Sequence, residues 1–381
     1  MIRIGIDARP SVWYRGTGIG NYTYQLVQHL QRMDRVNMYS ILWPDDCPLP
    51  NLPPRWRATA MPKKRSDERQ LIGPWLREQD LDVYHLPQNG LRAPADLGRT
   101  RLVVTIHDLI PFLLPEYVRH SFARRFLREV PAAAKRAARV VTVSRRSACD
   151  LTRILGVDEG KIRVVYPAPE EVFRPVPAAA RRRVAAELAV RYGVHEPYAL
   201  YVGGITPRKN LFDLVYAFGK ICRQLVPQMT LVISGLLGQH GSQVAELSEL
   251  LGLKSYVRLP GEVPLSDLPA LYSLATFAVY PSMYEGFGLP PLEAMACGTP
   301  VLCSDAGSLP EVVGRAGLIV RSGDVTALSE GMLRLAGDPW LRDRLVTRGE
   351  RHVARFSWAA TAAGILDAYR EAAAQEETGG G

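Results

Sequence analysis

Apolar residues follow two different periods along the first part of the chain. Isoleucines alternate with other residues over 2–6, which predicts a short strand, and apolar residues then recur at helical spacing over 22–30. Further β-branched runs at 102–106 and 140–143 are separated by a helical pattern over 122–138. Strands that alternate with helices form parallel sheets covered by helices, so we predict an α/β domain here.

A second series of the same kind follows a proline-rich segment. Four prolines in residues 167–177 interrupt both periods and predict a linker. The elements expected after it are a strand at 198–202, a helix over 211–225, and strands at 230–233, 276–280, 300–303 and 317–320. We therefore predict two α/β domains, 1–170 and 171–358, followed by a last segment, 359–381. Ligands of such folds bind beyond the carboxyl ends of the strands, here in a cleft between two sheets.

Composition and length agree with a folded protein of two domains. The chain has 381 residues, of which 47% are hydrophobic and 22% charged, so disordered and fibrous classes are disfavoured. The 5 cysteines are scattered and form no Cys-x-x-Cys pair, which argues against a disulfide framework or a thiolate zinc site. The sequence begins without the apolar run of a signal peptide, and no uncharged apolar stretch reaches the roughly 18 residues of a spanning helix. We expect a cytoplasmic location, with at most peripheral membrane contact.

Positive charge is concentrated in the first half. The net charge is +9, and residues 51–150 carry 19 Lys and Arg against 10 Asp and Glu. Such an excess favours an anionic partner, whether nucleic acid, acidic lipid or a phosphorylated small molecule. Residues 119–146 lack the stacking-aromatic pattern and the modules of nucleic-acid-binding proteins, so nucleic acid is disfavoured.

The same segment, 119–146, is predicted to form a face that docks on an anionic membrane surface. Its basic residues are Arg119, Arg124, Arg125, Arg128, Lys135, Arg136, Arg139, Arg145 and Arg146, and the apolar residues beside them are Phe122, Phe126 and Leu127. The alternative is an ordinary solvated helix face, because charge runs are common on soluble helices.

The richest cluster of chemical groups lies at 284–298, after a predicted strand. Two glycines and two prolines keep Glu285 out of any helix, so this residue is expected in a loop. A helix begins at the prolines, and Glu293 is expected within its first turn. Backbone donors converge at the same helix end, namely the N–H groups of Gly286, Phe287, Gly288 and Leu289. Donors for an anion beside carboxylates for hydroxyls suit a phosphorylated sugar, and the alternative is a loop with a helix-capping glutamate.

Two adjacent bases follow the first strand of the second domain. Arg208 and Lys209 come after a Gly203-Gly204 turn, so both are expected at the carboxyl edge of the sheet. A guanidinium and an ammonium together can clamp a diphosphate and offset the charge that develops as it departs. The alternative is a solvated helix start.

The first domain offers two candidate elements of its own. Gly16, Gly18 and Gly20 form a Gly-x-Gly-x-Gly turn after the first strand, without the Gly-x-Gly-x-x-Gly or P-loop spacing, which disfavours dinucleotide oxidoreductases and P-loop NTPases. Close approach of the backbone to a phosphate remains open. His107 and Asp108 end the strand at 102–106 and place a titratable ring at the cleft mouth, unless the histidine is purely structural.

Taken in order, these segments resemble family 4 of the retaining glycosyltransferases over nearly the whole chain. The segments are the amino-terminal glycine-rich loop, Ile106-His107-Asp108-Leu109-Ile110-Pro111, the Gly-x-x-Thr-Pro-Arg-Lys-Asn string at 203–210, and 285–298 with two glutamates separated by seven residues. The resemblance implies the GT-B fold, two facing Rossmann-like domains with a cleft between them. Asp7-Ala8-Arg9, residues 18–23 and the His-Asp-Leu-Ile-Pro string look like those of bacterial mannosyltransferases that build surface polysaccharides.

The resemblance also implies a role for each candidate residue. In the second domain, Arg208 and Lys209 would hold the diphosphate of a nucleotide sugar, Glu293 the ribose hydroxyls, and Glu285 with the amides of 286–289 the donor sugar and distal phosphate. The base would lie near Gly235 and the segment that ends at Val263. From the first domain, Gly16 and Gly18 would close on the diphosphate and His107 would face the transferred sugar. Such enzymes need neither metal nor other cofactor, and the segment 359–381 would cross back to the first domain.

The reaction implied is transfer of a hexose, with retention, to a saccharide or lipid-linked saccharide acceptor. Mannose from GDP-mannose is the first candidate, although no residue distinguishes guanine from uracil or mannose from glucose. The alternative is a catalytically silent protein that binds nucleotide sugars on the same fold, which the intact set of candidate residues disfavours.

One string could point to a metal instead. Asp80-Leu81-Asp82 matches the Asp-x-Asp pattern with which glycosyltransferases of another fold hold a divalent cation. It precedes the strand expected at 83–86, so its carboxylates are expected at the edge of the sheet away from the ligand. We interpret it as a solvated acidic turn.

Overall fold

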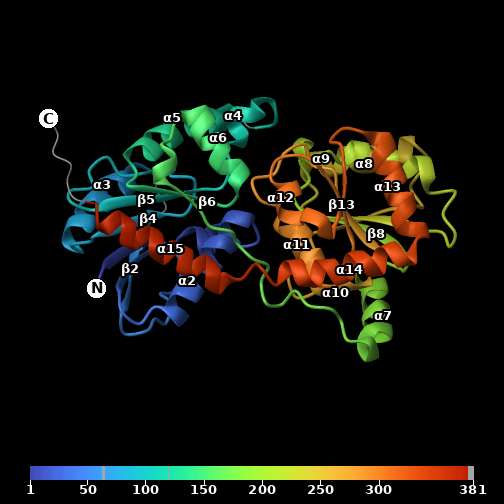
Figure 1. Cartoon of the computed structure of the whole chain (residues 1–381), viewed down its shortest axis with the longest axis horizontal. Coiled ribbons are helices and arrows are strands. Elements are labelled where there is room, and N and C mark those ends of the chain that lie inside the picture. Colours follow the sequence, from blue (N-terminus) through green and yellow to red (C-terminus); the bar gives the residue numbers. More distant parts are fainter. Residues whose placement is uncertain (62–64, 119, 376–381) are drawn as a thin grey trace. The chain divides into compact units, whose positions relative to one another are not determined.

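The computed structural model describes residues 1–61, 65–118 and 120–375, with side chains omitted for 65–70 (Figure 1). Contacts divide the chain into two compact units. Unit 1 consists of Met1–Pro167 with Ser357–Gly381, and unit 2 of Ala168–Phe356. The chain leaves unit 1 inside the segment 167–177, which forms neither helix nor strand.

Unit 1 is built on a parallel sheet of seven strands in the order β3-β2-β1-β4-β5-β6-β7. The strands are β1 Arg3–Asp7, β2 Met38–Pro44, β3 Trp56–Met61, β4 Val83–Leu86, β5 Arg101–Ile106, β6 Arg139–Thr142 and β7 Ile162–Val164. The strands predicted at 2–6, 83–86, 102–106 and 140–143 are confirmed. The order places β1 in the middle, between β2 and β4.

Helices cover both faces of this sheet. They are α1 Pro10–Trp13, α2 Gly18–Met33, α3 Arg65–Glu78, α4 Ile110–Leu113, α5 His120–Arg136, α6 Arg145–Leu155 and α15 Trp358–Ala373, with short 3-10 turns at Pro115–Tyr117 and Glu159–Lys161. Buried side chains of α3, α5 and α6 pack against one face. α15 packs on the other face beside α2 (Figure 1).

A buried hydrogen-bonded histidine fixes α15 to the sheet. His85 of β4 contacts the Tyr369 hydroxyl through Nδ1 at 2.8 Å and the Thr105 hydroxyl through Nε2 at 2.8 Å. Burial lowers the pKa of His85 to about 3, so the ring is neutral and one nitrogen accepts while the other donates. The C-terminal helix is therefore bonded to the centre of unit 1.

Unit 2 has a parallel sheet of six strands in the order β10-β9-β8-β11-β12-β13. The strands are β8 Tyr198–Val202, β9 Thr230–Ser234, β10 Val257–Gly261, β11 Phe277–Tyr280, β12 Val301–Ser304 and β13 Leu318–Val320. All of them except β10 were predicted from the sequence. The reversal of strand order around β8 is typical of Rossmann-like sheets, whose ligands bind beyond the carboxyl ends of the strands.

The helices of unit 2 lie on both faces of its sheet (Figure 1). They are α7 Arg181–Tyr192, α8 Leu211–Ile221, α9 Gly238–Leu250, α10 Leu268–Leu274, α11 Leu289–Ala296, α12 Leu309–Val313, α13 Val325–Gly337 and α14 Pro339–Val353, with 3-10 turns at Ala178–Ala180, Pro207–Lys209 and Gly314–Ala316. The prediction that α8 extends to 225 is wrong. The helix ends at Ile221, and residues 222–224 form a turn in which Gln224 N–H donates to Ile221 O at 2.8 Å.

Candidate functional site

The loops at the carboxyl edge of the sheet of unit 2 are bonded to one another. Gly203 N–H, after β8, donates to Ser234 O at 3.0 Å, and Gly235 N–H, after β9, donates to Gly261 O of β10 at 2.9 Å. A Cβ atom at Gly235 would lie 2.0 Å from Gly203 O, so a larger residue would push the β8 and β9 loops apart. Gly235 and the buried Val263 thus lie at the same edge, where the base of a nucleotide is expected.

Arg208, Lys209 and Glu285 form one ion-pair cluster at this edge. Arg208 Nη1 donates to Glu285 Oε2 at 3.1 Å and to the backbone oxygen of Tyr284 at 3.0 Å. Lys209 Nζ pairs with Glu285 Oε1. Met283 N–H donates to Arg208 O at 2.7 Å, which joins the loop after β8 to the loop after β11. Two loops about 75 residues apart in sequence thus bring the three predicted residues into contact.

The carboxylate of Glu285 is an anion under all ordinary conditions. Burial alone would raise the pKa of Glu285, whose side chain is 12% exposed, but Lys209 and Arg208 lower it to about 2. Ser282 Oγ donates a further hydrogen bond to Glu285 Oε1 at 2.7 Å. Glu285 therefore acts as the counter-ion of both bases, and an entering diphosphate would compete with it for their charge.

The prediction that Glu293 lies in the first turn of its helix is wrong. α11 begins at Leu289, before both prolines, so Glu293 is its fifth residue and lies in the second turn. Tyr272 Oη donates to Glu293 Oε2 at 3.1 Å. Burial raises the pKa of Glu293 to about 7. The hydrogen bond from Tyr272 lowers this pKa, and the charge of Glu170 raises it. The two glutamates thus have opposite electrostatic environments.

The loop between Glu285 and α11 has a fixed backbone. Ser308 Oγ donates to the backbone oxygens of Glu285 at 3.0 Å and Phe287 at 2.6 Å. Gly288 precedes the helix with a φ of 109°, and a Cβ there would lie 2.9 Å from the side chain of Leu309. The dihedral angle favours glycine at this position, and a Cβ there would also require the Leu309 side chain to shift.

The loop predicted at the glycine-rich segment of unit 1 is shorter in the structure. α2 begins at Gly18, so only Gly16 lies in the loop, with a φ of 92°. The helix starts early because Thr17 caps it, accepting from Gly20 N–H at 3.3 Å. Asn21 Oδ1 accepts from Gly16 N–H at 2.9 Å and from Arg15 Nη1 at 2.6 Å. Asn21 of α2 therefore holds this loop against the start of the helix.

His107 follows β5 in unit 1, as predicted, and is a neutral ring. Burial lowers the pKa of His107, and Nε2 lies 2.8 Å from Pro87 O. A carbonyl oxygen accepts only, so Nε2 carries the proton and Nδ1 is the acceptor nitrogen. The backbone N–H of His107 donates to Asn89 Oδ1 at 2.7 Å.

The predicted site residues are divided between the two units. Gly16, Gly18 and His107 belong to unit 1, and the others belong to unit 2.

Some residues that support the site were not predicted. The hydroxyl groups of Tyr272, Ser282 and Ser308 bond to Glu293, Glu285 and the loop between them. Single hydroxyl residues in separate elements have no characteristic spacing, so no sequence pattern points to them. In unit 1, Asp7 and Arg9 form a fully buried pair, with Nε–Oδ1 at 2.8 Å and Nη2–Oδ2 at 2.7 Å. Asp7 ends the central strand β1, and the sequence pointed to this pair only through the resemblance of Asp7-Ala8-Arg9 to mannosyltransferases.

The Asp-x-Asp string lies at the amino end of β4, as predicted. Asp80 pairs with Arg3 and Arg99, and Asp82 Oδ2 accepts from Arg3 N–H at 2.7 Å. Its carboxylates thus neutralise neighbouring arginines. Within 1–61, 65–118 and 120–375, no group of three or more His, Cys, Asp and Glu residues could hold a metal ion.

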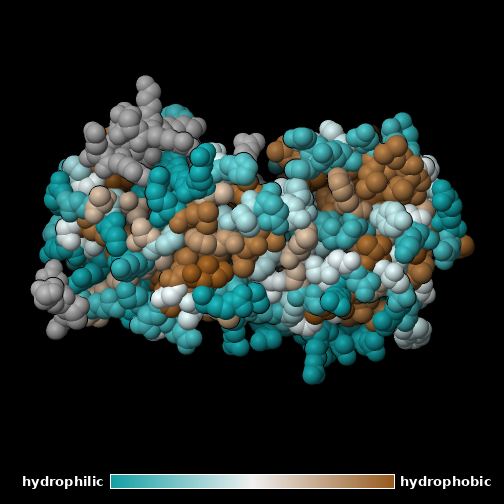
Figure 2. Space-filling view, turned by 90° about the horizontal axis from the view of Figure 1, so that it is seen from above, coloured by the Kyte–Doolittle hydropathy of each residue, from teal (hydrophilic) through white to brown (hydrophobic). Residues whose placement is uncertain are grey.

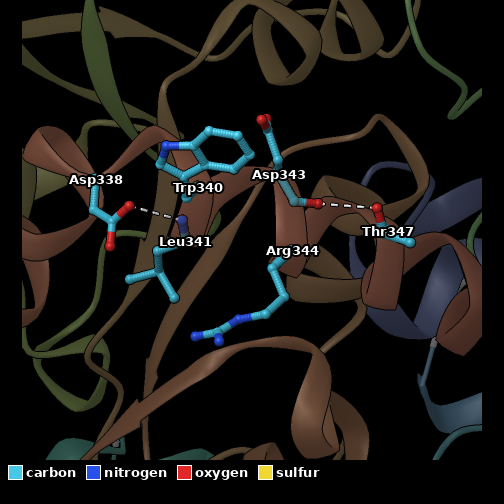
Figure 3. A pocket seen from close by; sticks show the side chains of 6 residues that line it. All are labelled: Asp338, Trp340, Leu341, Asp343, Arg344 and Thr347. Carbon is cyan, nitrogen blue, oxygen red and sulfur yellow. Dashed lines mark hydrogen bonds between the residues drawn. The ribbon is translucent and has the colours of Figure 1, made fainter.

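A surface hollow of about 430 Å³ beside α14 contains none of the candidate residues (Figure 3). It is lined by Asp338, Trp340, Leu341, Asp343, Arg344 and Thr347. Asp338 caps α14 by accepting from Leu341 N–H at 2.9 Å, and Thr347 Oγ1 donates to Asp343 O at 3.0 Å. These polar groups serve the helix, and the candidate site remains at the sheet edges.

Comparison with known proteins identifies two family domains in the chain. Residues 16–168 match glycosyltransferase family 4, and residues 191–352 match the glycosyl transferases group 1. The O-antigen chain mannosyltransferase B of Escherichia coli is 34% identical over 295 residues, covering 77% of this chain and 76% of that protein. The serotype-specific mannosyltransferase WbdA of Escherichia coli is 31% identical over 71% of this chain, which spans about a third of that protein's length.

Solved structures confirm the predicted GT-B fold. Sucrose-phosphate synthase from Thermosynechococcus elongatus superimposes with a TM-score of 0.77 at 24% identity, covering 97% of this chain and 98% of that one. None of the helices in the described part of the chain is long and apolar enough to cross a membrane. With two family domains matched in order and a relative similar over three quarters of its length, the chain belongs to the glycosyltransferases that join a family 4 domain to a group 1 domain.

Proposed function

We propose that this glycosyltransferase moves a hexose, with mannose from GDP-mannose as the first candidate, to a saccharide or lipid-linked saccharide acceptor. Transfer proceeds with retention and without a divalent cation or other cofactor. The observation that carries the proposal is the cluster of Arg208 and Lys209 around the carboxylate of Glu285. The relatives named as mannosyltransferases support the choice of sugar.

The cluster supplies what departure of a nucleoside diphosphate requires. Negative charge grows on the leaving phosphate oxygen, and two fixed cations nearby stabilise that charge more than they stabilise the bound donor. Arg208 offers a planar fork of donors and Lys209 a compact charge. Glu285 holds both side chains in place before the donor binds, and then becomes available to accept from hydroxyl groups of the sugar.

The remaining candidates act on other parts of the donor. Glu293 accepts hydrogen bonds from the ribose hydroxyls, and Gly16 and Gly18 allow the backbone of unit 1 to approach the diphosphate closely. His107 has its proton on Nε2, so the unprotonated Nδ1 accepts from a hydroxyl of the transferred sugar.

A donor panel tests the function. GDP-mannose, UDP-glucose, UDP-N-acetylglucosamine and UDP-galactose are compared by donor hydrolysis and by thermal shift, each with and without EDTA. We expect GDP-mannose to be turned over fastest and EDTA to leave its turnover intact. A strict requirement for Mg²⁺ or Mn²⁺ would contradict the metal-free mechanism, and binding without turnover of any donor would favour the silent scaffold.

We also propose that α5 docks on an anionic membrane surface, where lipid-linked acceptors are found. Phe122 and Leu127 are 43% and 39% exposed, and Arg124 and Arg128 are exposed beside them. Viewed from the side of α4, α5 and α6, hydrophobic and hydrophilic side chains lie next to one another (Figure 2). Each base near an anionic surface contributes on the order of 1 kcal/mol to binding.

The structure makes this surface smaller than the predicted segment. Phe126 is buried in the core, Arg139 pairs with Glu371 of α15, and Arg146 pairs with Asp150. Arg125 and Arg128 both pair with the partly buried Glu129, and of the two only Arg128 stays exposed. Arg119 lies outside the described residues.

Co-sedimentation with vesicles tests the docking surface. The wild type should pellet with anionic vesicles at low salt and be released at high salt, whereas an Arg124→Glu/Arg128→Glu variant should stay in solution. Arg174→Glu/Arg182→Glu, at two exposed positions of unit 2, is the charge-matched control and should still pellet. Equal pelleting of all three proteins, or equal pelleting on neutral lipid, would leave α5 as ordinary surface.

A further inference from the structure

The imidazole of His107 lies against the aromatic ring of Tyr22. Tyr22 is a buried residue of α2, and its ring centroid lies 4.8 Å from that of His107 with the two planes at 89°. The ring of His107 is otherwise bonded through Nε2 to a single backbone oxygen, that of Pro87. One hydrogen bond does not by itself set the plane of a ring, so edge-to-face packing against Tyr22 contributes to it.

Tyr22 is in turn packed against Trp358, the first residue of α15. The two ring centroids are 5.8 Å apart, and Trp358 also stacks on His29 of α2 with centroids 6.1 Å apart. Ser357 Oγ caps α15 by accepting from Ala360 N–H at 3.1 Å, so the helix start is well defined. Trp358 is thus placed where the chain re-enters unit 1.

The same end of α15 also holds the segment on which the chain leaves unit 1. Thr361 Oγ1 donates to Tyr166 O at 2.7 Å. A Cβ at Gly364 would lie 3.1 Å from both γ-methyls of Val165, so this helix and that segment are in close contact. Tyr22 therefore lies between His107 and the point at which both connecting segments are anchored.

We propose that Tyr22 is a positioning residue for His107 in glycosyl transfer, and that Trp358 fixes Tyr22 in that position. The inference rests on the proposed function, in which Nδ1 of His107 accepts from the sugar. A ring that is free to turn about its Nε2 hydrogen bond would lose the direction of Nδ1. Small errors of orientation in a reacting complex lower the rate of the chemical step more than the affinity for the donor.

The contribution of the Tyr22 ring is separated from that of its hydroxyl by two substitutions. Tyr22→Leu removes the ring and should lower kcat about 10-fold with the donor KM nearly unchanged. Tyr22→Phe keeps the ring and should retain most of the wild-type kcat. Trp358→Leu and Trp358→Phe should show the same contrast with a smaller loss. Trp340→Leu, at a tryptophan that is 85% exposed on α14, is the matched control and should change neither constant.

The orientation of His107 is measured without turnover by ¹⁵N–¹H spectra of the imidazole in the free protein. Wild type and Tyr22→Phe should show one Nε2–H tautomer and a ring-current shift from the neighbouring ring. Tyr22→Leu should lose the shift and broaden the ring signals, while the hydrogen bond to Pro87 O keeps the proton on Nε2. Unchanged His107 signals in Tyr22→Leu, or a loss in Tyr22→Phe as large as in Tyr22→Leu, would overturn the inference. If Tyr22→Leu does not fold, the Trp358 pair decides in the same way.

Failure of the proposed function gives a different result. Wild-type turnover in His107→Ala would remove His107 from the reaction, whatever the spectra show. Altered His107 signals in Tyr22→Leu together with unchanged kcat would show that the packing is real but does not serve transfer, which overturns the inference alone.

Discussion

Replacing Arg208 or Lys209 with alanine should lower turnover about 10²–10³-fold, because each removes one cation from the departing diphosphate. The two bases contact the same carboxylate in the free protein, with Arg208 Nη1 at 3.1 Å from Glu285 Oε2 and Lys209 Nζ beside Oε1. Groups that act on one leaving group are not independent. We therefore expect the double variant to lose less than the product of the two single losses.

Geometry as well as charge should matter at position 208. Arg208→Lys keeps the charge but loses the planar guanidinium, whose Nη1 donates to both Tyr284 O and Glu285 Oε2, so its turnover should lie between those of wild type and Arg208→Ala. Lys220→Ala, at an exposed lysine of α8 in the same unit, is the control and should be fully active. The measurement is kcat with saturating donor, alongside a thermal melt that verifies folding.

These variants can contradict the assignment directly. Near-normal turnover in both Arg208→Ala and Lys209→Ala would show that the bases serve only to neutralise Glu285. Restoration of either variant by Mg²⁺, with no effect of Mg²⁺ on the wild type, would support the view that the bases take the place of a cation.

The sequence predicted the sheet of unit 2 better than that of unit 1. β8, β9, β11, β12 and β13 are short apolar runs between glycine, proline and helical stripes, so their limits are visible. β2 is an apolar run interrupted only by Ser40, and such a run does not differ from a buried helix in periodicity. β3 and β10 are edge strands with weak apolar patterns, and β10 even contains a proline.

The closeness of Arg208, Lys209 and Glu285 could be predicted from the sheet topology alone. Loops after parallel strands share one edge of a sheet, so residues just after β8 and just after β11 had to lie close together. Their mutual ion pairing does not follow from topology, because the sequence pattern indicates only what each residue would offer to a ligand. The turn occupied by Glu293 was also missed, since it depends on whether the helix starts at Leu289 or one or two residues later.

The electrostatic difference between Glu285 and Glu293 leads to an opposite pattern of binding losses. Glu293→Ala should weaken binding of the nucleoside diphosphate alone, because the ribose is present in that ligand. Glu285→Ala should spare the nucleoside diphosphate or even strengthen its binding, since it frees Arg208 and Lys209, and should instead impair use of the intact donor. Calorimetry of both variants with both ligands tests this, and equal losses in all four titrations would show that the roles are misassigned.

Glu293 should also make nucleotide binding depend on pH near neutrality. Burial raises the pKa of this carboxyl to about 7, so the group is mainly protonated at pH 6 and mainly ionised at pH 8. Only the carboxylate can accept from both ribose hydroxyls, so affinity should rise with pH, by up to about 10-fold between pH 6 and pH 8.

The control for this pH profile is Glu293→Gln, which keeps the shape of the side chain and an oxygen for the Tyr272 hydrogen bond but does not titrate. Ionisation of the ligand's own phosphate affects both proteins equally, so the difference between their profiles reports Glu293. Glu285, with a pKa near 2, contributes nothing in this range, and Glu285→Gln should therefore keep the wild-type slope. Parallel profiles for wild type and Glu293→Gln would contradict contact between the ribose and an ionised Glu293.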